Sequence, residues 1–214
     1  AILPPETFDE QYGGQFRPRS GRVYPEFDRA LHVRPWQAQP PGLVFRGIDF
    51  GYRAPSACLW LILDDRGRAH VLREHYAPLQ MMDQLARSIT EVDDELAAQG
   101  LRVGPAWADP SGAGHIATLG VHGIRANRAH NSIATGLDLV RTLLRVGPDG
   151  APGLTVDPGC VNLVAEFENY QWADARPGAE ALPAKGQDHA LDALRYALVG
   201  MQRKVGWMER PLVC

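Results

Sequence analysis

The pattern of hydrophobic and polar positions changes twice along the chain. Residues 1–42 are rich in proline, glycine and charge and show no sustained periodicity, which predicts an extended arm or linker. From Leu43 onward, three short apolar segments are separated by turn residues. They predict strands at 43–50, 56–63 and 68–75 that form an antiparallel meander. We therefore expect residues 43–214 to form the folded domain.

After the meander the apolar spacing becomes helical. Apolar residues recur at intervals of three and four between Met81 and Leu96, which predicts a helix that ends near Gly100. Further along, the pattern predicts alternating elements: strands at 105–109, 123–127 and 154–156, and helices at 112–119, 132–146, 162–170 and 187–202. A meander followed by alternating helices and strands is the order of a ribonuclease H-like α/β fold, a central mixed β-sheet flanked by helices. Many α/β folds share parts of this order, so it does not decide the fold alone.

The composition limits the classes of function. The 214 residues are 45% hydrophobic and 22% charged, and the longest apolar run, 58–63, is far shorter than the roughly 20 residues of a membrane helix. The three cysteines have neither zinc-site spacing nor a disulfide framework, which suits a reducing cytoplasm. The net charge of −3 argues against tight unaided DNA binding, although a metal site would use several of the acids. A start at Ala1 suits a piece of a longer protein or loss of the initiator methionine.

Acidic residues stand out at three places in the predicted fold. Asp49 ends the first strand, Asp109 ends a later strand, and Asp188 and Asp192 open the last helix. If the first and fourth strands are neighbours, Asp49 and Asp109 project from one edge of the sheet, and the start of the helix lies over them. Hard divalent cations prefer such oxygen ligands, and clustered carboxylates repel one another without a cation. Two ions would suit hydrolysis of a phosphodiester.

Each acid also has a simpler interpretation. Asp188 suits a helix N-cap, and Asp109 suits the start of a turn. Asp192 falls about 160° from the apolar stripe of its helix, on a face expected to be solvated. Asp49 is hardest to explain otherwise, because an acid in an apolar strand is costly unless it is paired or metal-bound. Together the three places favour a metal site.

Three segments, 47–52, 108–112 and 185–196, resemble the acidic motifs of the nuclease domains of viral large terminases, the DNA-packaging enzymes of tailed bacteriophages. The last, Lys-Gly-Gln-Asp-His-Ala-Leu-Asp-Ala-Leu-Arg-Tyr, is the most distinctive. The resemblance runs over nearly the whole chain and implies a ribonuclease H-like endonuclease that cuts double-stranded DNA. It implies two Mg²⁺ or Mn²⁺ ions at the catalytic residues Asp49, Asp109 and Asp188. His189 and Asp192 remain candidate ligands or neighbours of the ligands.

The resemblance also implies partners. Segments 8–12 and 23–27 resemble the join between a packaging ATPase and the nuclease, so residues 1–42 are expected to follow an ATPase domain that this chain lacks. The full-length protein would act with a small terminase and a portal, in the cytoplasm of an infected bacterial host, and no membrane partner is expected. The chain contains no Gly-x-x-x-x-Gly-Lys-Ser/Thr phosphate loop, so we do not expect it to hydrolyse ATP.

Several cations are candidate contacts for the DNA backbone. Arg53 follows Asp49 closely enough to meet a scissile phosphate, and Arg125 and Arg128 form a small basic cluster after a strand. Lys185 lies three residues before Asp188 and could hold a phosphate or balance the carboxylates. Each of these side chains could also be an ordinary surface residue.

Other functions remain open from the sequence. Residues 47–51 followed by a strand hairpin look like the first phosphate loop of an actin-like or sugar-kinase-like ATPase, but that architecture needs two such domains, and 214 residues are too few. The chain could also be another ribonuclease H-like nuclease, of the resolvase or transposase type. A catalytically inactive DNA-binding module is the third alternative, although the three intact acidic positions argue against it.

Overall fold

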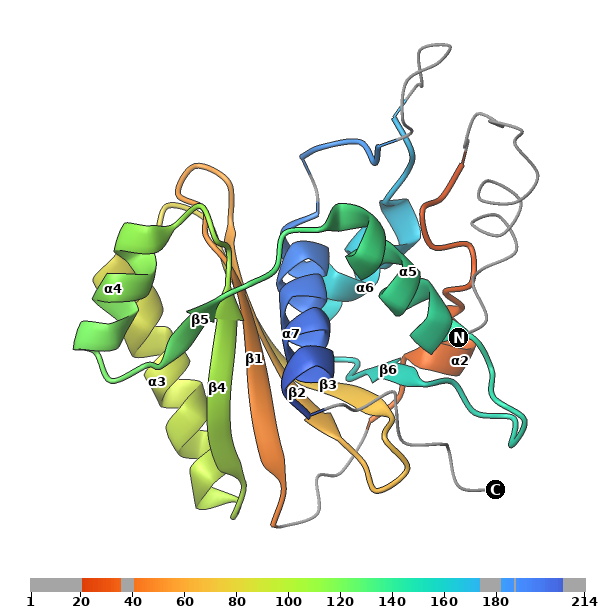
Figure 1. Ribbon diagram of the computed structural model, residues 1–214, viewed down its shortest axis with the longest axis horizontal. Helices are drawn as coiled ribbons and strands as arrows, with labels where there is room; N and C mark the ends of the chain where they lie inside the picture. Colours follow the sequence, from red (N-terminus) through yellow and green to blue (C-terminus); the bar gives the residue numbers. More distant parts are fainter. Residues whose placement is uncertain (1–20, 36–40, 174–181, 187, 206–214) are drawn as a thin grey trace.

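A six-stranded mixed sheet forms the centre of the molecule (Figure 1). The computed structural model describes residues 21–35, 41–173, 182–186 and 188–205. The strands lie in the order β5-β4-β1-β2-β3-β6. In chain order they are β1 (Leu43–Asp49), β2 (Ser56–Leu63), β3 (Ala69–Ala77), β4 (Arg102–Ala108), β5 (Ala126–Arg128) and β6 (Leu154–Val156). Strands β1, β2 and β3 form the predicted antiparallel meander, and β4 pairs with β1 in parallel.

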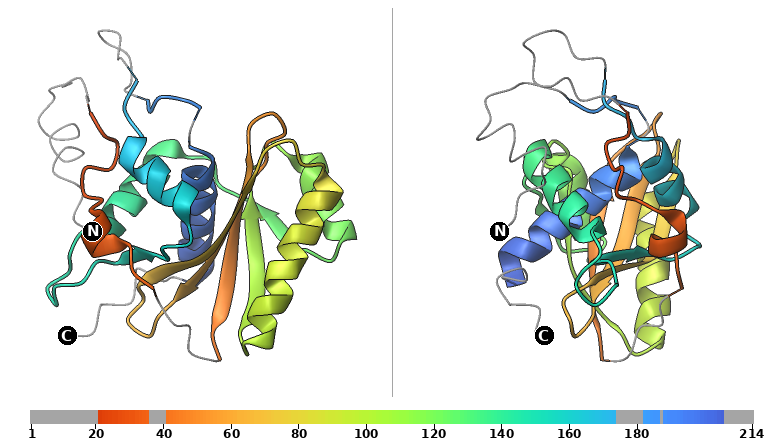
Figure 2. Two further views of the ribbon diagram at one scale, coloured as in Figure 1. Left: turned by 180° about the vertical axis from the view of Figure 1, so that it is seen from behind. Right: turned by 90° about the vertical axis from the view of Figure 1, so that its right-hand side faces the viewer.

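Helices cover both faces of the sheet (Figures 1 and 2). One face carries α3 (Met82–Ala98) and α4 (Ala113–Val121), and the other carries α5 (Ile133–Leu144), α6 (Val161–Asn169) and α7 (His189–Val205). Alternate residues of a strand point to opposite faces. Accordingly, Trp60 packs in the α3 and α4 core, whereas Leu59 and Leu61 pack in the larger core with α7. None of the helices in the described ranges is both long enough and apolar enough to cross a membrane.

Glycines let α7 lie close to the sheet. A Cβ atom added at Gly47 in β1 would lie 1.9 Å from the backbone oxygen of Ala193, and one added at Gly200 would lie 2.2 Å from the indole ring of Trp107 in β4. No larger residue fits at either position without movement of the backbone or the indole. The first turns of α7 are therefore held directly over β1.

Part of the predicted N-terminal arm packs into the larger core. Residues 21–35 include α2 (Arg29–His32), which is capped by the side chain of Asp28. Val23 and Tyr24 are fully buried, and the ring of Phe27 stacks on that of Phe167 with centroids 4.5 Å apart. Residues 1–20 and 36–40 of the predicted arm lie outside the described residues.

Two strands begin three residues away from their predicted starts, for identifiable reasons. Strand β4 begins at Arg102 rather than at 105, because a bulge accommodates Gly104 and Pro105 opposite a single residue of β1. Strand β5 begins at Ala126 rather than at 123, because Gly123 adopts a positive φ of 78° in the turn after α4. Neither difference moves the ends of the strands that carry Asp49 and Asp109.

Candidate active site

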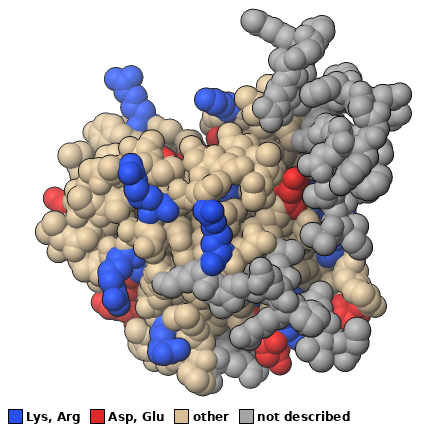
Figure 3. Space-filling view, viewed as in Figure 1, with Lys and Arg blue, Asp and Glu red and all other residues tan. Residues whose placement is uncertain are grey.

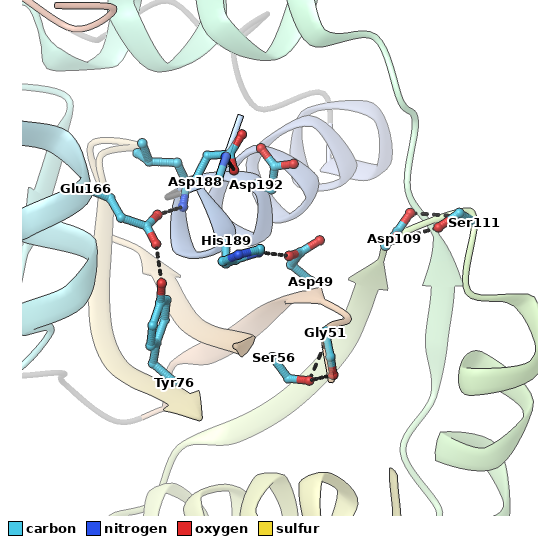
Figure 4. Close-up of polar contacts among 12 residues, drawn as sticks. Asp49, Gly51, Ser56, Tyr76, Asp109, Ser111, Glu166, Asp188, His189 and Asp192 are labelled. Carbon is cyan, nitrogen blue, oxygen red and sulfur yellow. Dashed lines mark hydrogen bonds and ion pairs between the residues drawn. The ribbon is translucent and has the colours of Figure 1, made fainter. Parts of the chain in front are cut away.

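Two acids meet at the carboxyl ends of neighbouring parallel strands. Ile48 of β1 pairs with Ala108 of β4, and the amide of Asp109 donates to the carbonyl oxygen of Ile48 at 3.0 Å. Asp49 and Asp109 therefore leave the same edge of the sheet, side by side (Figure 4). The first and fourth strands are neighbours, which is the condition under which these two acids project from one edge of the sheet.

The start of α7 lies over Asp49. Nδ1 of His189, the first residue of the helix, is 2.9 Å from Oδ2 of Asp49. Both side chains are largely buried, at 17% and 11% exposure. Figure 4 shows the carboxylate of Asp192, one turn further along, on the same side of the helix as this pair.

The predicted solvated face at Asp192 is wrong. Its side chain is 24% exposed and pairs with the guanidinium of Arg195, which is 4% exposed. The prediction assumed that one side of the helix faces water. In the structure α5 and α6 pack against α7 away from the sheet, and Gly136 of α5 lies directly against Arg195. Asp192 consequently faces the candidate site rather than bulk water.

The acids influence one another electrostatically. Burial raises the pKa of Asp49 to about 6; the hydrogen bond from His189 opposes this rise, and repulsion from Asp192 and Asp109 adds to it. Burial also raises the pKa of Asp192, against the opposing charge of Arg195. The hydrogen bond with Asp49 raises the pKa of His189. The site thus concentrates negative charge that water solvates poorly.

Asp188 precedes α7, but another acid accepts a hydrogen bond from the first turn. The amide of Leu191 donates to Oε2 of Glu166 at 2.9 Å, and the hydroxyl of Tyr76 donates to the other oxygen of Glu166 at 2.9 Å. The side chain of Asp188 instead accepts from the hydroxyl of Tyr170 at 3.2 Å and from the amide of Gly186 at 3.4 Å. In the described residues, the N-terminal amide of Leu191 is therefore satisfied without Asp188.

Sequence reasoning missed Glu166. It is a buried carboxylate in α6, 5% exposed, and it joins β3, α6 and α7 through Tyr76 and Leu191. The available signal was its spacing from Leu163 and Tyr170, three and four residues away, which puts an acid on the apolar stripe of the predicted helix. Such an acid is costly to bury unless it is hydrogen-bonded.

Each carboxylate that faces the site has a protein partner. Asp49 is bonded by His189, Asp192 by Arg195, and Asp109 by Ser111, whose amide and hydroxyl donate to it at 2.9 and 2.6 Å. Within the described residues, no three histidine, cysteine or acidic side chains are already gathered as a metal cage. The donor set still fits a hard divalent cation, because it consists of carboxylate oxygens whose mutual repulsion a cation would relieve.

The candidate DNA-binding cations lie on the surface. Arg53, Arg125, Arg128 and Lys185 are all exposed. The guanidinium of Arg128 donates at 2.9 Å to the carbonyl oxygen of Pro110, the residue after Asp109. Lys185 lies in the segment that leads into α7. Figure 3 shows basic side chains spread over the face of the molecule seen in Figure 1.

Comparison with known proteins identifies the fold. No family model matches the chain, and neither does any curated protein. Among solved structures, the large terminase of the thermophilic bacteriophage D6E superimposes with a TM-score of 0.75 at 21% identity, over 94% of this chain and 51% of that one. The P22 large terminase nuclease domain gives a TM-score of 0.64 at 18% identity, over 86% of this chain and 93% of that domain. The chain has the fold of a phage large terminase nuclease domain.

A third structure with the terminase nuclease fold contains a metal. It is the large terminase nuclease of the thermophilic phage G20c with bound magnesium, which gives a TM-score of 0.62 at 14% identity over 83% of this chain and 96% of that one. The predicted ribonuclease H-like fold and the predicted likeness to terminase nuclease domains are confirmed. The chain spans about half the length of the D6E protein and nearly all of the P22 and G20c nuclease domains.

Proposed function

We propose that this chain is a metal-dependent endonuclease that cleaves double-stranded DNA, the nuclease domain of a phage DNA-packaging terminase large subunit. One observation carries the proposal: Asp49 and Asp109 end neighbouring parallel strands, and the start of α7 places His189 and Asp192 over them. The terminase nuclease fold supports it, since a magnesium-bound structure of that fold is known.

Asp49, Asp109 and Asp188 are the proposed catalytic residues and ligands for Mg²⁺ or Mn²⁺, with Asp192 and His189 as further candidates. When bound, two such ions supply an activated water and charge stabilisation for the leaving oxygen of the phosphodiester. His189 orients Asp49, because its Nδ1 lies within hydrogen-bond distance of one carboxylate oxygen, and such partners fix ligand orientation. Arg195 holds Asp192 in the same way.

The exposed cations would hold the substrate. Arg53, Arg125, Arg128 and Lys185 are exposed, and we propose that they neutralise DNA phosphates. Phosphate contacts fix the register of the duplex without reading its sequence. We therefore expect cutting with little sequence preference and an affinity that falls steeply with salt.

The remaining partners belong to the full-length protein. The D6E large terminase is about twice as long as this chain, and one of its structures holds ATP-gamma-S. By analogy, a packaging ATPase domain would precede residues 1–42 in the intact protein. That protein would act with the small terminase and the portal in the cytoplasm of the infected bacterium.

A plasmid assay tests the proposal. Supercoiled plasmid is incubated with the chain in Mn²⁺, in Mg²⁺ or in EDTA, and nicked and linear products are measured. We expect cutting with metal, none in EDTA, and none by Asp49→Asn. The matched control is Asp65→Asn, which changes an exposed acid in the β2–β3 turn and should cut at the wild-type rate. Cutting that persists undiminished in EDTA would remove the metal mechanism.

A further inference from the structure

Two loops present exposed apolar side chains beside the candidate active site. One loop joins β1 to β2 and contains Tyr52, 55% exposed; the other joins β3 to α3 and contains Leu79, 66% exposed, and Met81, 61% exposed. The amide of Leu79 donates to the carbonyl oxygen of Tyr52 at 2.6 Å, so the loops are adjacent. We call Tyr52, Leu79 and Met81 the apolar rim. It lies at the edge of the sheet where β1 ends in Asp49 (Figure 1).

The backbone of Leu79 is strained. Its φ is +55°, and it is the one non-glycine residue with a positive φ in the part of the chain that the structure describes. An L-residue in this conformation is strained by contact between its Cβ and the backbone, and glycine would avoid that strain. A leucine can offset such strain by burial, but this side chain is two-thirds exposed. The stability of the isolated domain therefore does not explain a leucine here, whereas contact with a ligand would.

The first of these loops is held rigidly at its base. The hydroxyl of Ser56, which is buried, accepts from the amide of Gly51 at 3.1 Å and donates to the carbonyl oxygen of the same residue at 2.7 Å (Figure 4). A Cβ atom at Gly51 would lie 2.4 Å from the carbonyl oxygen of Pro55, so the turn is tight as well. A rigid loop presents its side chains with little loss of entropy on binding.

The charge of the two loops favours an anionic occupant. Residues 50–55 and 78–81 contain one cation, Arg53, which is exposed, and no acid. Apolar side chains next to an arginine match the surface of duplex DNA, where apolar groups pack on sugars and base edges of the minor groove and arginine meets phosphate. The position next to Asp49 would bring such a duplex to the candidate active site.

We propose that the apolar rim binds duplex DNA. Tyr52 and Leu79 pack against the sugars and base edges of the groove, and Arg53 meets a neighbouring phosphate. The contact holds the backbone of one strand over Asp49 and so positions the scissile phosphate. The inference rests on the proposed function and adds to it a specific substrate-binding surface.

To test whether the apolar rim binds DNA, we propose to measure DNA binding and DNA cutting separately. Binding of a short fluorescent DNA duplex is titrated in EDTA, and the rate of plasmid cutting in Mn²⁺ is measured against substrate concentration. Leu79→Gly and Tyr52→Ala should each weaken binding roughly fivefold, since each removes apolar area that the duplex would cover. KM should rise by a similar factor while kcat changes little. Val121→Ala, which changes a valine of α4 that is 84% exposed, is the matched control and should behave as wild type.

The melting temperature gives the sharper result. Leu79→Gly should not lower the melting temperature, because it relieves the positive φ, yet it should weaken DNA binding. If glycine loosens the loop and the protein melts earlier, Leu79→Asn keeps a residue that tolerates this conformation and still removes the apolar contact.

The experiment distinguishes an error in the rim inference from an error in the proposed function. A wild type that neither binds nor cuts DNA contradicts the proposed function. A wild type that cuts, with unchanged binding and KM in both rim variants, overturns the rim inference alone. If the apolar rim instead binds a second copy of this chain, the wild type should sediment as a dimer and the variants should bind DNA as the wild type does. That result would also overturn the rim inference.

Discussion

Substitution of Gly47 by alanine should separate α7 from the sheet. The added methyl would lie 1.9 Å from the backbone oxygen of Ala193 and 2.9 Å from the Cβ of Ala197. Non-bonded heavy atoms favour separations near 3.5 Å, so the helix or the strand must move by roughly 1.5 Å. Neither side can yield by changing a rotamer, because the closest contact is backbone. The movement would shift His189 away from Asp49.

This displacement should lower both the melting temperature and the rate of plasmid cutting. Overpacking of a well-packed core costs about 1–3 kcal/mol. In a protein of this size, each kcal/mol lowers the melting temperature by about 2–4 °C, so a fall of about 2–12 °C is expected. A misplacement of catalytic groups by about 1 Å can cost 10²-fold in rate, and the plasmid-cutting rate in Mn²⁺ should fall by about that factor.

A second glycine provides the control. Gly120 lies in α4, and a Cβ atom there would have nothing within 4 Å. Gly120→Ala should leave cutting unchanged and stabilise the protein by about 0.5–1 kcal/mol, because alanine favours the helix. A Gly47→Ala variant with the wild-type cutting rate and melting temperature would refute the close approach of α7 to β1. Equal losses in both variants would show that the contact is not the cause.

Further predictions concern the acids. Asp49→Asn and Asp109→Asn should each abolish plasmid cutting while circular dichroism stays unchanged, because each keeps the side-chain size and removes the charge that holds the cation; full activity in either would overturn the site. Asp188→Asn should cut far more slowly than the wild type. Its melting temperature should change little, since Glu166 already accepts a hydrogen bond from the first turn of α7. Cutting at the wild-type rate would show that Asp188 has a structural role only. In EDTA, the free energy of unfolding should rise as pH falls from about 7 to 5. With a pKa of about 6, Asp49 binds a proton in the folded state over this range, whereas in the unfolded chain its carboxylate stays ionised. A series of melting curves in which Asp49→Asn shows the same dependence on pH as the wild type would contradict this.

The edge of the sheet was predictable because it depends on local patterns. Apart from Arg46, the first strand reads as apolar up to Asp49, and Asp109 follows a second apolar segment before a proline turn. Strand periodicity and turn residues are short-range signals, and they were enough to put both acids at strand ends. The sequence left open whether the first and fourth strands are neighbours, and the order of the sheet shows that they are.

The surroundings of α7 were less predictable because they depend on contacts distant in sequence. The position of Asp192 opposite the apolar stripe predicted a solvent-exposed side chain, because an amphipathic helix is assumed to expose one face to water. A helix covered by the sheet and by two other helices has no such side, and Asp192 pairs with the buried Arg195. Glu166 was missed for a related reason: its partners, Tyr76 and Leu191, lie 90 and 25 residues away.

Under the proposed function, the contact between His189 and Asp49 also determines how early in biosynthesis the nascent chain could cut DNA. The two residues are 140 positions apart in the chain. A ribosome that adds about 5–20 residues per second makes Asp49 roughly 7–28 seconds before His189. Through that interval a nascent chain carries the sheet-edge acids without the helix that encloses them. Cutting therefore has to wait until translation has passed α7, and a chain terminated earlier would carry the acids without a competent nuclease.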